Sequence, residues 1–235
     1  MKPVTFLLSA VILLFTISCA PSRFYIDQNF KDIEPNSTLI ITNVNEIDIS
    51  QSYDLFTLEN LRVLRNSYYD IQKVRLPREL KEISRFDKIE TTSYKTPPQF
   101  EKRVFQINPK ETVEVMVPKS RLNYDLGGLL YVLFFENYKI AFELEETDTS
   151  DPAKHFTAEK LPGLEPSLSP SRLYKLNFTI RCKYYFYDNR NEKVLLAGNA
   201  VIKERYSPEM NLENKMLESI KLLAQRLIDK TPFAK

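Results

Sequence analysis

The side chains best suited to chemistry in this sequence are two cysteines and one histidine, Cys19, Cys182 and His155. A single histidine excludes any site that needs two imidazoles, such as His-rich zinc sites and di-metal clusters. His155 lies in a segment rich in prolines and polar residues, so we predict an exposed loop residue rather than a general base. Cys182 lies on the apolar side of an alternating segment, so we expect a small buried thiol with no base to activate it.

Motifs for other kinds of chemistry are missing. The sequence contains no Walker loop, no His-Glu-x-x-His, no nucleophile elbow and no Cys-x-x-Cys pair. Gly127 and Gly128 precede an apolar run, whereas the glycines of a dinucleotide site follow a strand, so this pair is predicted to form a turn. The acidic residues between Glu145 and Asp151 lack the glycine and the terminal glutamate of a calcium loop. We therefore predict no catalytic residue, no metal site, no cofactor and no enzymatic activity.

Cys19 stands at a boundary between two kinds of sequence. An uncharged run from Val4 to Ile17 follows the positive start at Lys2. At ~1.5 Å per helical residue this run spans roughly 21 Å, which is less than the ~30 Å hydrocarbon core of a bilayer. That length is typical of a signal peptide. Ser18 then precedes Cys19, and a polar segment begins at Ala20.

This N-terminus resembles the signal of bacterial lipoproteins, although Thr16 occupies a position where leucine is commoner. The resemblance implies that Cys19 becomes the first mature residue and carries diacylglycerol and a further acyl group, which together give stable membrane attachment. Two alternatives are an ordinary secretory signal with an incidental Cys19 and an N-terminal anchor helix. We predict a lipoprotein signal peptide at 1–18 and a lipidated tether at 19–37. Because Ala20 is not acidic, the resemblance also implies the outer membrane, with the protein facing the periplasm.

The remainder, residues 38–235, has the composition of a single folded domain. Over all 235 residues, Lys and Arg number 33 against 31 Asp and Glu, a formal net charge of +2, so nothing indicates a nucleic-acid binder. Hydrophobic residues make up 43% and charged residues 27%, which excludes a wholly disordered chain. The expected partners are the membrane, through Cys19, and other envelope proteins, while the sequence indicates no particular small-molecule ligand.

Hydrophobic patterns in the first half predict alternating strands and helices. Residues 37–44 are β-branched and predict a strand. The next segment predicts a helix that is capped by Asp54 and ended or offset at Pro77. A second strand is predicted at 86–92, while 99–124 fits either a helix or a strand.

The second half gives clearer patterns. The apolar run 129–135 indicates a strand covered on both faces, and 137–145 is either its bent continuation or the return arm of a hairpin. Residues 173–187 alternate between apolar and polar, as a long half-buried strand does. The chain then turns and returns at 193–206, where Gly198 indicates a bulge or a close backbone approach.

The C-terminal segment predicts an amphipathic helix. Ser207 is placed to cap it and Thr231 to close it, and apolar residues between them form one wide stripe. The predicted fold class is α/β, with α+β as the alternative. It consists of one mixed sheet with a long C-terminal antiparallel hairpin and a packed C-terminal helix.

This order of elements resembles the envelope lipoproteins that have a TolB-amino-terminal-like or curli-secretion-like α/β domain. The likeness lies in residues 78–89, in Tyr124-Asp125 before the apolar run, and in 183–188 before Gly198. The resemblance implies an α/β envelope domain, and no functional residue is carried over from it.

One group of side chains in the long hairpin could bind a partner. Arg181, Lys183, Tyr185 and Tyr187 lie on the face opposite the apolar one and form an aromatic and cationic strip. This strip could bind a protein, a glycan or a polyanion, or a helix or second layer could cover it. We predict a non-catalytic, lipid-anchored assembly or accessory component of the envelope. The alternatives are a module that binds glycan or peptidoglycan and, third, a hydrolase whose site carries no recognised motif.

Overall fold

A computed structural model describes residues 24–51, 58–91, 98–123, 129–147, 173–207 and 210–235. The predictions about the signal peptide, Cys19, Asp54, the Gly127–Gly128 turn and His155 lie outside the described residues, as do those about the acidic connector after Thr147. The described elements are β1 Phe24–Ile26, β2 Ser37–Asn43, β3 Asp48–Gln51, α2 Leu58–Ile83, β4 Lys88–Thr91, β5 Phe100–Asn108, β6 Glu111–Pro118, β7 Leu129–Thr147, β8 Leu173–Asp188, β9 Lys193–Arg205 and α3 Leu212–Ile228.

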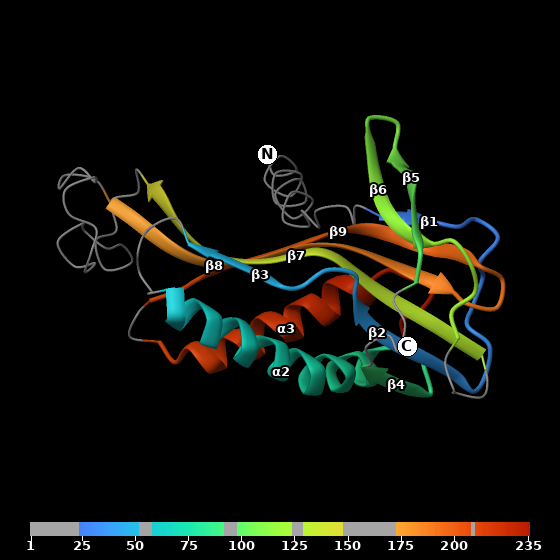
Figure 1. The fold of residues 1–235 in the computed structure, drawn as a ribbon, viewed down its shortest axis with the longest axis horizontal. Coiled ribbons are helices and arrows are strands. Elements are labelled where there is room, and N and C mark those ends of the chain that lie inside the picture. The colour runs from blue at the N-terminus through green and yellow to red at the C-terminus, as the bar shows by residue number, and fades with distance from the viewer. Residues whose placement is uncertain (1–23, 52–57, 92–97, 124–128, 148–172, 208–209) are drawn as a thin grey trace, which may run out of the picture.

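A mixed seven-stranded sheet forms the centre of the molecule, in the order β1-β9-β8-β7-β2-β4, with β3 also pairing with β7. In the series β1, β9, β8 and β7 each strand is antiparallel to the next, whereas β2 is parallel to both β7 and β4. Both described helices lie on one face of this sheet, and the β5–β6 hairpin rises on the other (Figure 1). The predicted α/β class, the long antiparallel hairpin and the packed C-terminal helix are confirmed.

Strand β7 decides between the two predictions for residues 137–145, a bent continuation of the strand or the return arm of a hairpin. It is a single strand that continues past a bulge, because its pairing with β8 shifts register between Glu136 and Lys139. Asn137 adopts a positive φ of 51° at this point. Strand β2 pairs with β7 before the bulge and β3 pairs with it afterwards, both in parallel. The segment is therefore the bent continuation and not a return arm.

Helix α2 runs through Pro77, which the sequence predicted to end or offset it. Proline has no backbone N–H, so the carbonyl four residues earlier, that of Lys73, loses its helical donor. The Thr91 hydroxyl of β4 donates to that carbonyl across 3.4 Å. Leu76 and Leu80 on either side of the proline are fully buried. Packing and this substitute donor allow the helix to continue to Ile83.

Residues 99–124, which fitted either a helix or a strand, contain the β5–β6 hairpin. The two strands pair antiparallel from Phe100 opposite Pro118 to Asn108 opposite Glu111. Val113, Val115 and Val117 of β6 are buried, whereas β5 is mostly exposed or half-buried. The hairpin thus turns one strand towards the sheet and the other towards solvent.

Two hydrophobic cores lie on opposite faces of the sheet. The larger lies under α2 and α3 and includes an aromatic stack in which the Phe186 and Phe233 rings are 4.4 Å apart. The smaller lies under β6 and contains Val132, Phe134, Tyr185 and Tyr187. Because residues of β7 and β8 contribute alternately to both cores, these strands are buried on both faces where the hairpin covers them.

The described part of the predicted tether belongs to the sheet. Strand β1 pairs with Leu196–Gly198 of β9, and the Asp27 backbone N–H donates to the Leu195 carbonyl over 2.9 Å. The Asp27 side chain is buried and forms an ion pair with Lys193. Residues 24–27 at the described start of the predicted tether are therefore held on the domain by pairing with β9 and by a buried ion pair.

Helix α3 begins later than predicted. Its N-cap is Asn211, whose Oδ1 accepts a hydrogen bond from the Asn214 backbone N–H over 3.1 Å, so the predicted cap at Ser207 is wrong. Ser207 instead accepts at its carbonyl from the Met210 N–H. Among the described helices, none combines the length and the apolar character that a membrane crossing requires.

Candidate partner-binding groove

The strip predicted from the sequence does not form an exposed surface. Tyr185 and Tyr187 have no solvent exposure, because the β5–β6 hairpin covers them. The Tyr185 hydroxyl donates to the Met116 carbonyl of β6. The Tyr185 ring also stacks on Phe134 with 4.6 Å between centroids. The prediction of an aromatic binding strip is therefore wrong for its two tyrosines, and the alternative of a covering second layer is correct.

The two cations of the strip are engaged within the domain. The Arg181 guanidinium donates to Glu143, with 2.9 Å between Nη2 and Oε2. This hydrogen bond lowers the pKa of the Glu143 carboxyl, against the opposing effect of burial. Lys183 donates from Nζ to the Glu114 carbonyl over 3.0 Å. Arg181 and Lys183 thus connect β8 to its neighbours in the structure.

Cys182 lies where the sequence predicted it, on the buried side of β8. Burial raises the pKa of its thiol, so the unreactive thiol form is favoured. Among the residues that the structure describes, no group of His, Cys, Asp and Glu is arranged to hold a metal ion. Surface cavities are also present in the described part of the chain.

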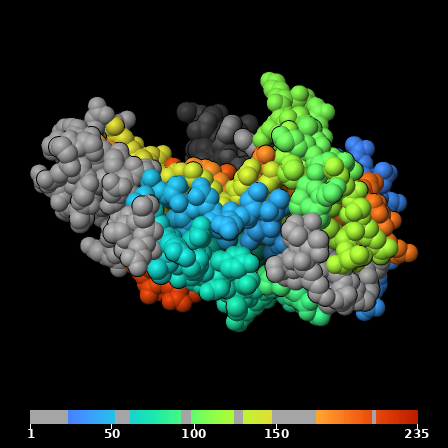
Figure 2. Space-filling model, in the orientation of Figure 1, coloured from blue at the N-terminus to red at the C-terminus, as the bar shows by residue number. Residues whose placement is uncertain are grey.

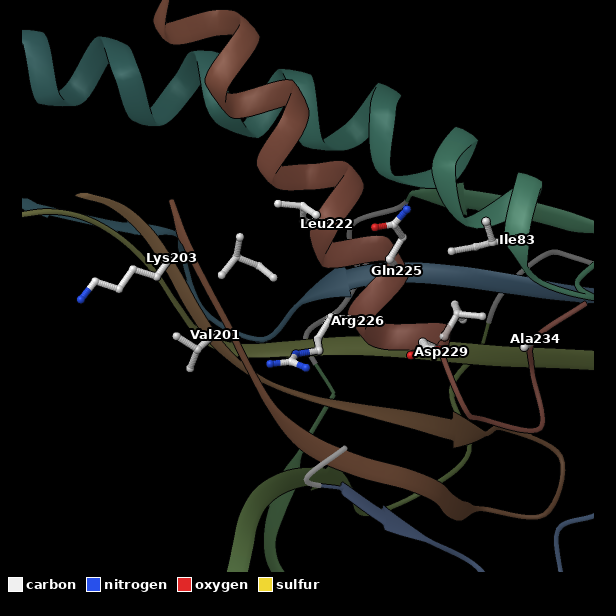
Figure 3. Close-up of a pocket in the computed structure, with 10 residues that line it drawn as sticks. Ile83, Val201, Lys203, Leu222, Gln225, Arg226, Asp229 and Ala234 are labelled. Atoms are coloured by element: carbon white, nitrogen blue, oxygen red, sulfur yellow. The ribbon is translucent and has the colours of Figure 1, made fainter. Parts of the chain in front are cut away.

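One of these cavities is an open groove between strand β9 and helix α3, with a volume of about 650 Å³. Figure 3 shows Leu222 and Arg226 extending from α3 towards β9, which carries Val201 and Lys203. Its complete described lining is Ile83, Val201, Ile202, Lys203, Leu222, Gln225, Arg226, Ile228, Asp229 and Ala234.

Apolar side chains lie exposed in this groove. Val201 is 47% exposed and Leu222 is 37% exposed. Ile202 and Ile228 form its buried floor. The groove therefore combines apolar contact area with charges at its margin, which is the composition of a protein-binding surface.

The groove follows a sheet edge that is only partly covered. Strand β1 pairs with β9 at Leu196–Gly198 and ends there, whereas β9 continues to Arg205. On its other side β9 stays paired with β8 as far as Arg205. From Asn199 to Arg205, then, the outer edge of β9 has no partner strand in the described part of the chain.

A second cavity, of about 450 Å³, lies where the chain leaves β2 and before it enters β3. Its lining is mixed: Val44, Ile47 and Tyr69 lie beside polar residues that include the ion pair between Glu46 and Arg65. The first half of α2, which contributes Arg65, Asn66 and Tyr69 to this lining, lies side by side with the β3 segment in Figure 2. Asn43 Nδ2 donates to Gln72 Oε1 over 3.4 Å, and Asn43 Oδ1 accepts no hydrogen bond from any described residue.

Sequence reasoning missed the groove because separate segments form it. Two weak signals were present in the sequence. Val201 is an apolar residue between Asn199 and Lys203 on the otherwise polar side of β9, and Leu222 lies outside the apolar stripe of α3. Each alone is an ordinary surface residue. Only the fold places both beside an open strand edge.

Comparisons with known proteins give no family for this chain. No model of a known protein family matches it, and no curated protein matches it in sequence. Among solved structures, the PelC dodecamer from Paraburkholderia phytofirmans is similar at 8% identity and a TM-score of 0.32, over 89% of this chain and 97% of that one.

A second solved structure, a neuraminyllactose-binding hemagglutinin homolog from Helicobacter pylori, is similar at 9% identity and a TM-score of 0.38, over 88% of this chain and 90% of that one. Such low identities and TM-scores do not define a shared function. The resemblance to TolB-amino-terminal-like and curli-secretion-like domains stays a prediction.

Proposed function

We propose that this chain is a lipid-anchored, non-catalytic accessory protein of the bacterial envelope that binds a protein partner through the β9–α3 groove. The lipid anchor rests on the sequence, in which Cys19 directly follows Ser18 at the end of an uncharged signal-like run. Lipidation would hold the domain at a membrane surface and leave the groove available to a neighbouring protein.

The observation that carries the proposal is the groove itself. Val201 and Leu222 are exposed on either side of it, beside the open part of the β9 edge. Full burial of such a side chain from complete exposure is worth about 1.5–3 kcal/mol, and a partner would provide the part that corresponds to the area still exposed. An exposed apolar pair beside an unpaired strand edge therefore offers a partner both apolar contact area and backbone hydrogen bonds.

A site-specific crosslinking experiment tests the groove. A photoreactive residue at Leu222 of the full-length protein is expected to crosslink one envelope protein, and the added substitution Arg226→Glu should remove that adduct. A photoreactive residue at Val74, which is 76% exposed on α2, serves as the matched control. Equal crosslinking from both positions would contradict the groove as the binding site.

A separate measurement in the same cells tests the lipid anchor. Cys19→Ser should leave the precursor unprocessed or the product free of the membrane fraction, because no thiol remains to accept lipid. Unchanged processing and fractionation of the Cys19→Ser protein would contradict the lipid anchor and leave the groove result to stand alone.

A further inference from the structure

The open edge of β9 carries backbone groups that face away from the sheet. In an antiparallel strand, alternate residues direct both their N–H and their C=O to the same side. The Leu195 carbonyl accepts from Asp27 on the β1 side, whereas the Tyr206 N–H donates to Leu176 on the β8 side. The register between β8 and β9 is unbroken from Leu196 to Arg205. The same alternation therefore points the backbone groups of Val201, Lys203 and Arg205 outwards.

These outward groups have no strand to pair with in the described structure. Pairing with β1 ends at Gly198, and the groove begins at Val201, in the next part of the same edge. A further strand would lie about 4.8 Å from β9. The cavity beside β9 thus lies where a continuation of the sheet would be placed.

We infer that the groove binds an extended, acidic peptide segment of a partner protein, which adds to the sheet as a strand along Val201–Arg205. This inference rests on the proposed function and specifies the form of the partner. Strand addition draws its affinity from main-chain hydrogen bonds and its specificity from alternate side chains. Side chains of an added strand point alternately to the two faces of the sheet, so its apolar residues would lie against Val201 on one face and its acidic residues beside Arg226 on the helix face.

Charge complementarity selects an acidic segment. The exposed Arg226 extends from α3 towards Val201 (Figure 3) and has no ion pair within the described residues. Lys203 is on the same margin, where Glu145 accepts a hydrogen bond from it over 2.7 Å. Asp229 lies at the other end of the groove, on the side of Ala234. A glutamate or aspartate of the partner would therefore meet a free guanidinium beside the edge.

The test uses a defined probe, a nine-residue peptide of alternating valine and glutamate with blocked ends, added to the full-length protein in detergent. Binding is expected to slow hydrogen exchange at the backbone amides of Val201 and Lys203. The amide of Ile202, a residue that pairs with Ile180 of β8, should not change. A peptide of the same sequence with N-methyl groups on the pairing amides should bind about tenfold more weakly or worse, because it cannot donate.

Two substitutions at one position separate the backbone from the side chain. Val201→Pro removes the outward N–H, at an edge position that tolerates proline, and should abolish protection and binding. Val201→Thr keeps the N–H and should retain protection. The exchange rates of β8 amides report whether the Val201→Pro protein is folded.

The outcomes distinguish this inference from the proposed function. Equal affinity of the N-methylated peptide, or an unchanged exchange rate at Val201 and Lys203, would overturn strand addition. Loss of the Leu222 crosslink with Arg226→Glu but not with Val201→Pro would keep the groove as a partner site and overturn only the strand. A lysine-valine peptide that binds as well as the glutamate peptide would overturn the acidic partner.

Discussion

Two buried tyrosine hydroxyls show how single residues satisfy polar groups in the core. Tyr68 of α2 and Tyr138 of β7 are fully buried or nearly so, and their hydroxyl oxygens are 2.5 Å apart. Burial raises the pKa of both phenols, so both stay neutral and one hydroxyl donates to the other. The pair therefore couples α2 to β7 through a single shared hydrogen bond.

A double-mutant cycle should reveal this coupling. Tyr138→Phe leaves the Tyr68 hydroxyl buried without its partner, which costs about 1–3 kcal/mol in the free energy of unfolding. Replacing both tyrosines by phenylalanine removes both polar atoms and should lie closer to the unmodified protein than the single variant does. Urea denaturation of the four proteins measures the effect. Strictly additive losses would mean that the two hydroxyls do not depend on each other.

At the scale of elements, the stability of α2 depends on how the helix accommodates Pro77. Pro77→Ala restores a backbone donor for the Lys73 carbonyl and removes the ring from the helix interior. We expect it to stabilise the protein by up to about 3 kcal/mol, because proline is that unfavourable within a helix. Thermal or urea unfolding measures the change, and Arg78→Ala, one residue along on the exposed side, is the control. A destabilised Pro77→Ala protein would show that the proline is required for packing.

The regular part of the fold could be predicted from the sequence because its pattern is local. Strands β8 and β9 alternate cleanly, and β2 and the start of β7 are apolar runs that local periodicity detects. The β5–β6 hairpin could not be assigned, because Glu101, Lys102 and Arg103 are consecutive charged residues in a strand that faces solvent. Strand β1 is only three residues long, too short for any period to show.

The candidate site could not be predicted for a different physical reason. Alternation in β8 correctly placed Tyr185 and Tyr187 on one face, but a sequence pattern cannot show what covers that face. The covering strand, β6, lies about 70 residues earlier in the chain, as the hydrogen bond from Tyr185 to Met116 records. The groove likewise depends on β9 and α3 meeting beside an edge where β1 stops.

At the scale of the whole molecule, the buried tyrosines make the free energy of unfolding depend on pH in the alkaline range. Burial raises the pKa of Tyr68, Tyr138 and Tyr184, and it raises that of Tyr187 to about 12. In the unfolded chain tyrosine ionises near pH 10. The folded state therefore binds more protons than the unfolded state above about pH 10, and stability falls as pH rises through that range.

We expect the free energy of unfolding, measured in urea, to be constant with respect to these groups below about pH 9 and to decrease from about pH 10 upwards. Tyr187→Phe should reduce the steepness of that decrease, and it removes a hydroxyl that has no hydrogen-bond partner among the residues that the structure describes. The same slope with and without Tyr187 would show that its ionisation does not contribute.

The partly covered edge of β9 has a further consequence for how the protein behaves in a crowded compartment. An unpaired strand edge can template aggregation with other copies of the same chain. Lys203 and Arg205 lie along this edge, and charged side chains of this kind are a common protection against such self-association. The charged side chains along this edge would thus disfavour pairing with other copies of the chain and still allow pairing with a segment of opposite charge. Solubility and recognition would therefore depend on the same few residues.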